Sequence, residues 1–189
     1  MDLEARIREL VAAGDTRGAA TEAIRGLGPQ VLRYLRAMLR DEDAAADAFS
    51  VFAEKLWKGI ETFRGESSFR TWALKLAWNA TLDAKDDAWR RKGRRFEPGE
   101  ASAMAESIRT KSVVRTERQR RALDELRASL SAEDRSLLIL RVDQGLSWEE
   151  VAQVLAGEGS PARPDALMKR YERIKERLGK LARDRGLVE

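Results

Sequence analysis

Apolar residues recur along most of this chain at the spacing of an α-helix, and no strand-like alternation of apolar and polar residues persists. Ala, Leu, Arg and Glu dominate, whereas β-branched residues are sparse, which favours helices. The pattern predicts two short helices within residues 2–25, separated at 14–15, then a stop and restart at 26–29, and further helices over about 43–60 and 67–89. We therefore expect an all-α fold.

The C-terminal part of the chain carries two signals for the start of a helix. Ser131 with Asp134 fits an N-terminal capping pattern, and Ser147 with Glu150 fits the full capping box. The segment from residue 115 onward therefore resolves into a helix, a turn, a short helix, a longer turn and a final basic helix. This order is typical of a helix-turn-helix domain.

Apolar residues on both sides of the first turn are expected to form the core of that domain. They are Leu137, Leu138, Leu140 and Val142 before the turn, and Val151, Val154 and Leu155 after it. The longer turn, LAGEGSPARPDAL, offers two starts for the final helix, at Ser160–Pro161 or at Pro164–Asp165, and the sequence does not decide between them. Arg163 lies near the N-terminus of the final helix in either case.

The helical pattern weakens between about residues 93 and 113, where glycine, proline, serine and small residues replace the aromatic ones. This change predicts two small helical domains joined by a flexible linker. We place the N-terminal domain at residues 1–95, the linker at 96–114 and the helix-turn-helix domain at 115–189. The 43% of hydrophobic residues is enough to form a core in each.

Composition excludes several kinds of chemistry. The chain has no cysteine and no histidine, so it lacks thiolate nucleophiles, disulfides, histidine bases and the commonest metal ligands. We expect no catalytic residue, no metal and no cofactor. The acidic amphipathic start MDLEARIRELV is unlike a signal peptide, and no apolar run approaches the length of a membrane span. A cytoplasmic protein without membrane insertion is expected.

The segment from Phe63 to Arg95 is the most unusual part of the chain. It joins a glycine-bearing polar loop and an aromatic-rich helix, FRGESSFRTWALKLAWN, to a basic tail, WRRKGRR. The net charge of the whole chain is only +4, so this local cluster of cations matters more than the total. Aromatic and amide groups can bind bases while clustered cations bind phosphates, which favours a nucleic acid as the partner.

Several residues of this segment also have a purely structural interpretation. Phe63 could stack on an unpaired base or pack in the core, and Asn79 could bind a base edge or remain solvated. The cations from Arg90 to Arg95 could contact phosphates or form a solvated helix end. Helical spacing predicts that one set of residues faces the core, namely Phe69, Trp72, Ala73, Leu76 and Ala80. A neighbouring face is formed by Lys75, Trp78, Asn79 and Leu82.

Two runs of the chain carry a resemblance to a known family. FRGESSFRTWALKLAWN closely resembles the promoter-melting region of bacterial extracytoplasmic-function (ECF) sigma factors, and LSAEDRSLLILRVDQGLSWEEVAQVL resembles their other DNA-binding domain. Both runs occur in the family's order, with a family-like linker between them. The resemblance implies an alternative sigma factor, which binds core RNA polymerase and directs promoter recognition, DNA melting and transcription initiation.

For the downstream (minus-10) element, the resemblance implies capture of a flipped base of the non-template strand by a loop and the helix that follows it. The matching loop is Phe63 to Ser68, and Asn79 matches the asparagine of the family's TW-to-N run. Extruding a base costs a few kcal/mol, which hydrogen bonds and stacking must offset. The residues implied in this contact are Phe63, Arg64, Gly65, Ser67, Ser68, Lys75, Asn79, Asp83, Arg90, Arg91, Lys92, Arg94 and Arg95.

The resemblance also implies contacts with core RNA polymerase, through the clamp helices of the β′ subunit and the flap of the β subunit. The helix from Asp43 to Lys58 resembles the family's main polymerase-binding helix, although Ser50 and Val51 replace its usual Gln-Glu pair. The implied contact residues are Asp47, Ser50, Glu54 and Trp57. Because ECF sigma factors are commonly held by an anti-sigma factor, a partner of that kind is implied as well.

The final helix, ALMKRYERIKERLGKLARDRG, would read the upstream (minus-35) element in the major groove or along its phosphates. The implied contact residues are Arg163, Lys169, Arg170, Arg173 and Lys175. A charged, solvated helix face is the structural alternative for all of them.

Two other functions are compatible with parts of the sequence. A stand-alone helix-turn-helix regulator would explain the C-terminal domain, but it would leave the aromatic loop and the 43–60 helix without a role. A nucleic-acid-processing enzyme would need acidic residues around a metal ion. Asp41, Glu42 and Asp43 are adjacent in sequence, and adjacent helical positions do not converge on one ion.

Overall fold

The chain divides into two compact units, Met1–Thr110 and Lys111–Glu189. The described residues form helices and connecting turns without a β-strand, so the all-α prediction is confirmed. No helix among them is long and apolar enough to cross a membrane. The predicted linker, 96–114, lies outside the described residues. The computed structural model describes residues 2–90, 125–126, 129–157 and 162–184.

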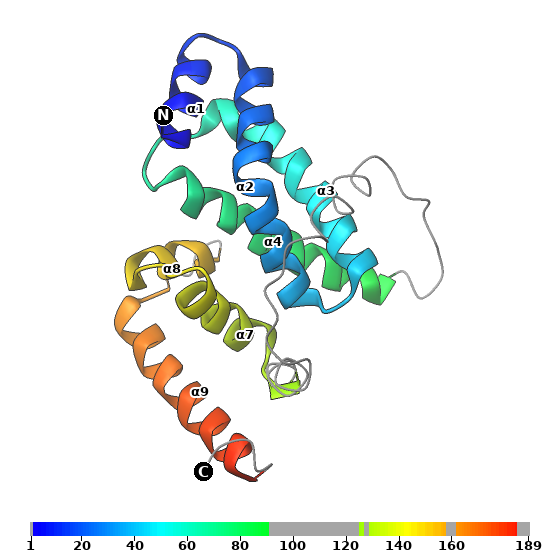
Figure 1. Cartoon of the computed structure of the whole chain (residues 1–189), viewed down its shortest axis with the longest axis vertical. Coiled ribbons are helices and arrows are strands. Elements are labelled where there is room, and N and C mark those ends of the chain that lie inside the picture. Colours follow the sequence, from blue (N-terminus) through cyan, green and yellow to red (C-terminus); the bar gives the residue numbers. More distant parts are fainter. Residues whose placement is uncertain (1, 91–124, 127–128, 158–161, 185–189) are drawn as a thin grey trace. The chain divides into compact units, whose positions relative to one another are not determined.

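In the N-terminal unit, helices α1, α3 and α4 all pack against the long helix α2 (Figure 1). Aromatic and aliphatic side chains from α2, α3 and α4 are buried between them, and each contributes about 1.5–3 kcal/mol by leaving water. The helices expected over 43–60 and 67–89 are confirmed. The elements are α1 (Leu3–Ala12), α2 (Thr16–Leu39), α3 (Glu42–Gly59), a 3₁₀ turn η1 (Ile60–Thr62) and α4 (Phe69–Arg90).

The stop and restart predicted at residues 26–29 is wrong, because α2 continues through them. Pro29 lies inside the helix and removes one backbone hydrogen bond, which packing of α2 against its three neighbours offsets. Gly28 serves close packing instead of helix termination. A β-carbon there would lie 3.4 Å from Cζ of Phe49 on α3, so the glycine lets the two helices approach.

The turns on both sides of α2 follow ordinary capping rules. The break expected at 14–15 is present: Gly14 has a φ of +76°, and the carboxylate of Asp15 accepts a hydrogen bond from the N–H of Gly18 at 2.8 Å. At the other end, Arg40 has a left-handed φ of 60°. Asp41 then caps α3 by accepting a bond from the N–H of Ala44 at 2.7 Å.

In the C-terminal unit, α9 packs against α7 and α8, which forms the expected helix-turn-helix arrangement (Figure 1). The Ser131 hydroxyl accepts a hydrogen bond from the N–H of Asp134 at 3.1 Å, and Ser147 and Glu150 form both bonds of the capping box. Both predicted helix starts are therefore confirmed. The elements are α7 (Ala132–Leu138), a π-helical turn η2 (Ile139–Asp143), α8 (Trp148–Leu155) and α9 (Pro164–Asp184).

Val142 does not belong to the C-terminal core, contrary to the prediction. It is 54% exposed, whereas Leu137, Leu140 and Val154 are buried as expected. The prediction assumed that an α-helix continues past Leu138. The wider π-helical turn η2 follows instead and changes the angle between successive side chains, which turns Val142 toward solvent.

The structure decides where the final helix starts. α9 begins at Pro164. Proline lacks a backbone N–H, but N–H groups in the first turn of a helix have no partner within the helix, so no hydrogen bond is lost there. The carbonyl of Arg163 accepts the first helical bond, from the N–H of Leu167 at 3.0 Å. The other candidate start, at 160–161, lies outside the described residues.

Candidate nucleic-acid interface

The loop from Phe63 to Ser68 connects η1 to α4. Gly65, at its middle, has a φ of +71° and is exposed, so the turn depends on a backbone conformation that other residues rarely adopt. Ser68 ends the loop as the cap of α4. Its hydroxyl accepts a hydrogen bond from the N–H of Thr71 at 3.1 Å and bonds the Thr71 hydroxyl at 2.7 Å. The far end of the loop is thereby fixed to the helix.

Three aromatic rings support this loop. The Phe63 ring lies 5.1 Å from that of Phe69 and 5.2 Å from that of Trp72, between ring centroids. Gly59 completes the cluster, because a β-carbon at this position would lie only 3.1 Å from Cζ2 of Trp72. Phe63 is half-buried and packs on the other two rings in this conformation.

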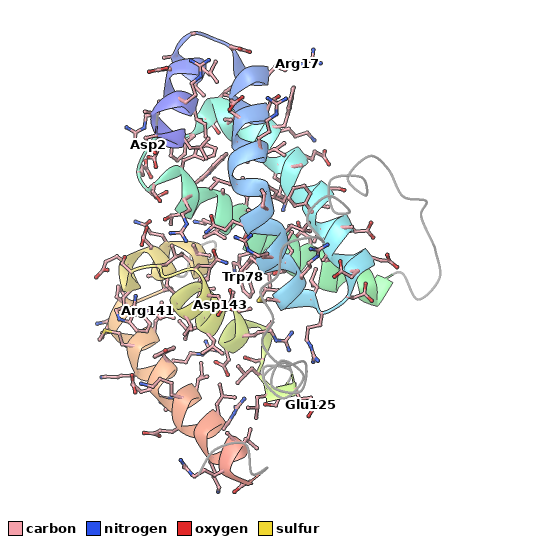
Figure 2. All side chains as sticks on the ribbon, viewed as in Figure 1. Asp2, Arg17, Trp78, Glu125, Arg141 and Asp143 are labelled. Atoms are coloured by element: carbon pink, nitrogen blue, oxygen red, sulfur yellow. The ribbon has the colours of Figure 1, made fainter. Side chains whose placement is uncertain are left out.

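Helix α4 buries more of its circumference than the sequence suggests. Phe69, Ala73 and Ala80 are buried as expected, but Trp72 is only half-buried. Trp78, labelled in Figure 2, was expected beside the core, but it is only 5% exposed and belongs to the core. The correction follows from packing, since α4 contacts both α2 and α3 and the two contacts together cover a wide arc of the helix.

The remaining outward ridge of α4 carries polar side chains one turn apart. Lys75 and Asn79 are half-exposed, and neither has a side-chain partner among the described residues. Asp83, one turn further on, forms an ion pair of 2.5 Å with Lys55 of α3. Residues four apart on a helix project from the same face, so the three lie in one row. The structure thus brings these predicted residues together.

Only the beginning of the basic tail lies within the described residues. Arg90 is the last residue of α4. The predicted phosphate contacts Arg91, Lys92, Arg94 and Arg95 lie outside the described residues. Arg64, by contrast, is exposed in the loop itself, beside Gly65.

The outer face of α3 carries all four residues predicted to bind the polymerase. Asp47, Ser50, Glu54 and Trp57 are exposed and follow one another at spacings of three or four residues. Trp57 is 49% exposed, which is unusual for the largest apolar side chain. Glu54 pairs with Lys58 at 2.5 Å, and this hydrogen bond lowers the pKa of the Glu54 carboxyl.

Phe49 and Phe52, on the other side of α3, have the structural role that the sequence allowed. They are 5% and 0% exposed, and their rings lie 5.6 Å apart between centroids. The aromatic residues of α3 therefore divide cleanly. Two hold the helix in the unit, and Trp57 alone of the three faces outward.

On α9, exposed cations form a row opposite the buried face. Leu167 and Ile174 are buried, while Lys169 and Arg173 project on the far side of the helix. Lys180 continues this row two turns later and was not predicted, although its spacing of seven from Arg173 is visible in the sequence. None of these three cations has an ion pair within the described ranges.

The other predicted cations, on α9 and directly before it, have partners inside the C-terminal unit. Arg170 reaches back to α7, Lys175 pairs with Glu172 at 3.0 Å, and Arg163 lies 3.4 Å from Asp165. The hydrogen bond to Glu172 raises the pKa of Lys175. The row and these paired cations are therefore two different sets.

An aromatic contact joins α9 to α8. The Trp148 and Tyr171 rings meet edge to face, with centroids 5.4 Å apart. Arg141, labelled in Figure 2, places its guanidinium 4.9 Å from the centroid of the Trp148 ring and donates a hydrogen bond to the carbonyl of Leu146 at 2.6 Å. These contacts fix one flank of α9 against the turn of the helix-turn-helix.

Comparison with known proteins finds relatives among RNA polymerase sigma factors. Residues 23–95 match the family model Sigma-70 region 2. The RNA polymerase sigma factor YlaC of Bacillus subtilis (strain 168) is 29% identical over 132 residues, which cover 67% of this chain and 73% of that protein. The chain is therefore similar to RNA polymerase sigma factors, and residues 23–95 correspond to their region 2. Sigma factors are non-enzymatic regulatory proteins.

Two solved structures have the same fold as this chain. CnrH, solved in complex with the cytosolic domain of CnrY, is 18% identical, with a TM-score of 0.65 over 97% of this chain and 99% of its own. The sigma factor RpoE, solved in complex with the anti-sigma factor NepR from Bartonella quintana, is 17% identical. Its TM-score is also 0.65, over 86% of this chain and 96% of its own.

Proposed function

We propose that this protein is an alternative (ECF) sigma factor, which opens promoters by capturing a base of the minus-10 non-template strand between the loop 63–68 and the outward ridge of α4. One observation carries the proposal. Lys75 and Asn79 stand in one row on an exposed arc of α4, and no described residue occupies their polar groups. An amide on such a ridge can bond a base edge, and an ammonium can bond the neighbouring phosphate.

The scaffold under the ridge suits the energetics of base capture. Flipping a base costs a few kcal/mol, and a loop that had to become ordered on binding would add to this cost. The cap at Ser68 and the rings of Phe63, Phe69 and Trp72 hold the loop before DNA arrives. Arg64 and the cations that follow α4 would neutralise the phosphates on either side.

The outer face of α3 is the proposed contact with the clamp helices of the β′ subunit. Trp57 supplies an exposed aromatic anchor, the residue type that most often dominates the energy of an interface. Asp47 and Glu54 lie on the same face, where Glu54 pairs with Lys58, so this face offers charged groups of both signs to a partner. Helix α4 packs directly on α3, so binding of polymerase and of the melted strand would occur on one rigid body.

The C-terminal unit is the proposed reader of the minus-35 element, with a further contact to the flap of the β subunit. The row of Lys169, Arg173 and Lys180 projects from a 21-residue helix on the side away from the core. A helix presented in this way fits the major groove, and its cations can contact base edges or phosphates.

Other parts of the proposal concern the setting in which the protein acts. It works in the cytoplasm, where polymerase and DNA are, and the polymerase supplies all the chemistry. By analogy with RpoE, which was solved with the anti-sigma factor NepR, we propose that an anti-sigma factor holds it in an inactive state. Such a partner would cover the outer face of α3.

Run-off transcription with purified core polymerase tests the proposal. Polymerase with this protein is expected to start transcripts at discrete genomic positions that core polymerase alone does not use. Sequencing the starts would also give the promoter consensus. Tight binding to duplex DNA without co-purification with polymerase, and without transcripts, would contradict the proposal in favour of a stand-alone regulator.

A further inference from the structure

Among the described residues of the C-terminal unit, Arg170 forms the most extensive polar contact between α9 and the other helices. Its Nε donates to Oδ1 of Asp134 at 2.6 Å, and its Nη2 donates to Oε2 of Glu133 at 2.9 Å. One guanidinium thus holds two neighbouring carboxylates in the first turn of α7, across more than thirty positions of sequence. The Asp134 side chain is only 15% exposed, so this contact is partly shielded from water.

The carboxylates that receive Arg170 are themselves held in place. The N–H of Asp134 donates to the Ser131 cap at 3.1 Å, which fixes the first turn of α7. Negative side chains in a first helical turn are also stabilised by the helix dipole. A second tether lies two turns further along α9, where Arg177 donates to the carbonyl of Ser129 at 3.2 Å. Because residues seven apart share a face, both arginines hold the same flank of α9.

This flank differs from the one that carries the exposed cations. At 100° per residue, Lys169 and Arg173 project on the side opposite Leu167 and Ile174, whereas Arg170 lies at the edge of the buried face. The aromatic contact of Tyr171 holds the other edge. The rotation of α9 about its own axis is therefore set by Arg170 on one side and by Tyr171 on the other.

We propose that Arg170 is a positioning residue for recognition of the minus-35 element, which fixes the rotation of α9 on α7 and makes no contact with DNA itself. The inference rests on the proposed role of α9 in DNA binding. It assigns Arg170 a different task from that of Lys169 and Arg173, which are the direct contacts.

Electrostatics separates the two roles. Arg170 and its two carboxylates together carry a net negative charge, which repels a phosphate instead of attracting it. Burial would lower the pKa of Arg170, but its hydrogen bonds to Glu133 and Asp134 outweigh burial and raise the pKa, so the guanidinium stays charged. Moving it onto DNA would leave two carboxylates without their partner at the interface.

The test measures binding of the full-length protein to a fluorescent 30-base-pair duplex, about three helical turns, selected by the wild-type protein from a random pool. Kd is followed from low to high salt for Arg170→Gln, Asp134→Asn and the double variant. We expect each single variant to weaken binding, Arg170→Gln by roughly tenfold, and the double variant to be no weaker than Arg170→Gln. The slope of log Kd against log salt should stay at the wild-type value, since no phosphate contact is lost.

Three results would overturn the inference. A slope lowered by about one unit in Arg170→Gln would mean a direct phosphate contact. Tighter binding by Asp134→Asn would mean that this carboxylate only competes with DNA for Arg170. A lower melting temperature of Arg170→Gln, with unchanged Kd at a temperature where the protein is folded, would mean that Arg170 stabilises the unit without positioning α9.

Arg173→Ala separates failure of the inference from failure of the proposed function. If the wild-type protein selects no duplex, or if Arg173→Ala leaves both Kd and the salt slope unchanged, then α9 is not the reader of DNA and the inference falls with that proposal. If Arg173→Ala lowers the slope, the proposed function stands, and the behaviour of Arg170→Gln alone decides the inference.

Discussion

Lys55 of α3 and Asp83 of α4 form an ion pair of 2.5 Å that links the proposed polymerase-binding helix to the proposed strand-capturing helix. Asp83 lies one turn beyond Asn79 on the outward ridge of α4. The carboxylate of Asp83 would by itself repel a phosphate bound at this ridge. The ammonium group of Lys55, on the neighbouring helix, neutralises that charge.

This pair is expected to add little to stability. Its side chains are 37% and 53% exposed, and ion pairs in such positions contribute about 0.2–1 kcal/mol. Lys55→Met and Asp83→Asn should each lower the free energy of unfolding by less than about 1 kcal/mol, and the double variant should not lose more than the sum. Urea denaturation measures this. A loss of several kcal/mol would mean that the pair holds α3 and α4 together.

Asn79→Ala is expected to weaken promoter opening while leaving polymerase binding unchanged. The substitution removes one base contact, worth about 1–3 kcal/mol, from a side chain that no described residue needs. Opening is measured by the fluorescence of a 2-aminopurine placed in the minus-10 element, and binding by titration of labelled protein with core polymerase. An equal loss of both, or no loss of opening, would remove Asn79 from the proposed contact.

Whether the sequence predicts a feature of this site depends on how far apart in the chain the residues that determine this feature lie. The caps at Ser131 and Ser147 and the row of Lys75 and Asn79 depend on residues within two turns, so periodicity and capping rules find them. The partners of Arg170 lie on another helix, and no local pattern reveals them. The sequence therefore groups Arg170 with the exposed cations, although its surroundings are different.

The errors have the same origin. Gly28 and Pro29 have strong turn propensity, but the packing of α2 against three other helices outweighs it. Val142 fits an α-helical apolar stripe only if α7 keeps its period, and η2 changes that period. Trp78 is buried because α4 packs against two helices at once, which a one-sided amphipathic pattern does not indicate.

Trp57→Ala should weaken binding to core polymerase by at least roughly tenfold with little effect on folding, because half of this side chain is in water and it is a potential interface anchor. Phe52→Ala is the matched comparison on the same helix. Phe52 is fully buried, so its truncation should cost about 3–5 kcal/mol of stability. Thermal denaturation and polymerase titration of both variants check this. If Trp57→Ala destabilised the fold as Phe52→Ala does, the outer face of α3 would not be a free surface.

The cation row of α9 makes a prediction about salt. Lys169→Ala, Arg173→Ala and Lys180→Ala should each lower the slope of log Kd against log salt by about 0.9 if the side chain contacts a phosphate. A residue that contacts a base edge should instead lose discrimination between the selected duplex and a scrambled one. Lys175→Ala is the control, because Lys175 pairs with Glu172 on another part of the helix. An equal effect of Lys175→Ala would mean that the row is not distinguished from the other cations.

Arg40→Gly is expected to stabilise the N-terminal unit, although it removes a side chain from a helix end. Arg40 is held at a φ of 60° between α2 and α3, and this left-handed conformation costs a residue with a β-carbon about 1–2 kcal/mol. Glycine adopts it freely but loses more chain entropy on folding, about 0.5–1 kcal/mol, so a net gain of about 0.5–1 kcal/mol remains.

Gly14→Ala makes the opposite change at a φ of +76° with no atom within 4 Å of the added β-carbon, so only the backbone conformation opposes it. It should be destabilising by a similar amount. Urea denaturation of the two variants gives both values, and destabilisation by Arg40→Gly would mean that contacts of the arginine side chain outweigh its backbone strain.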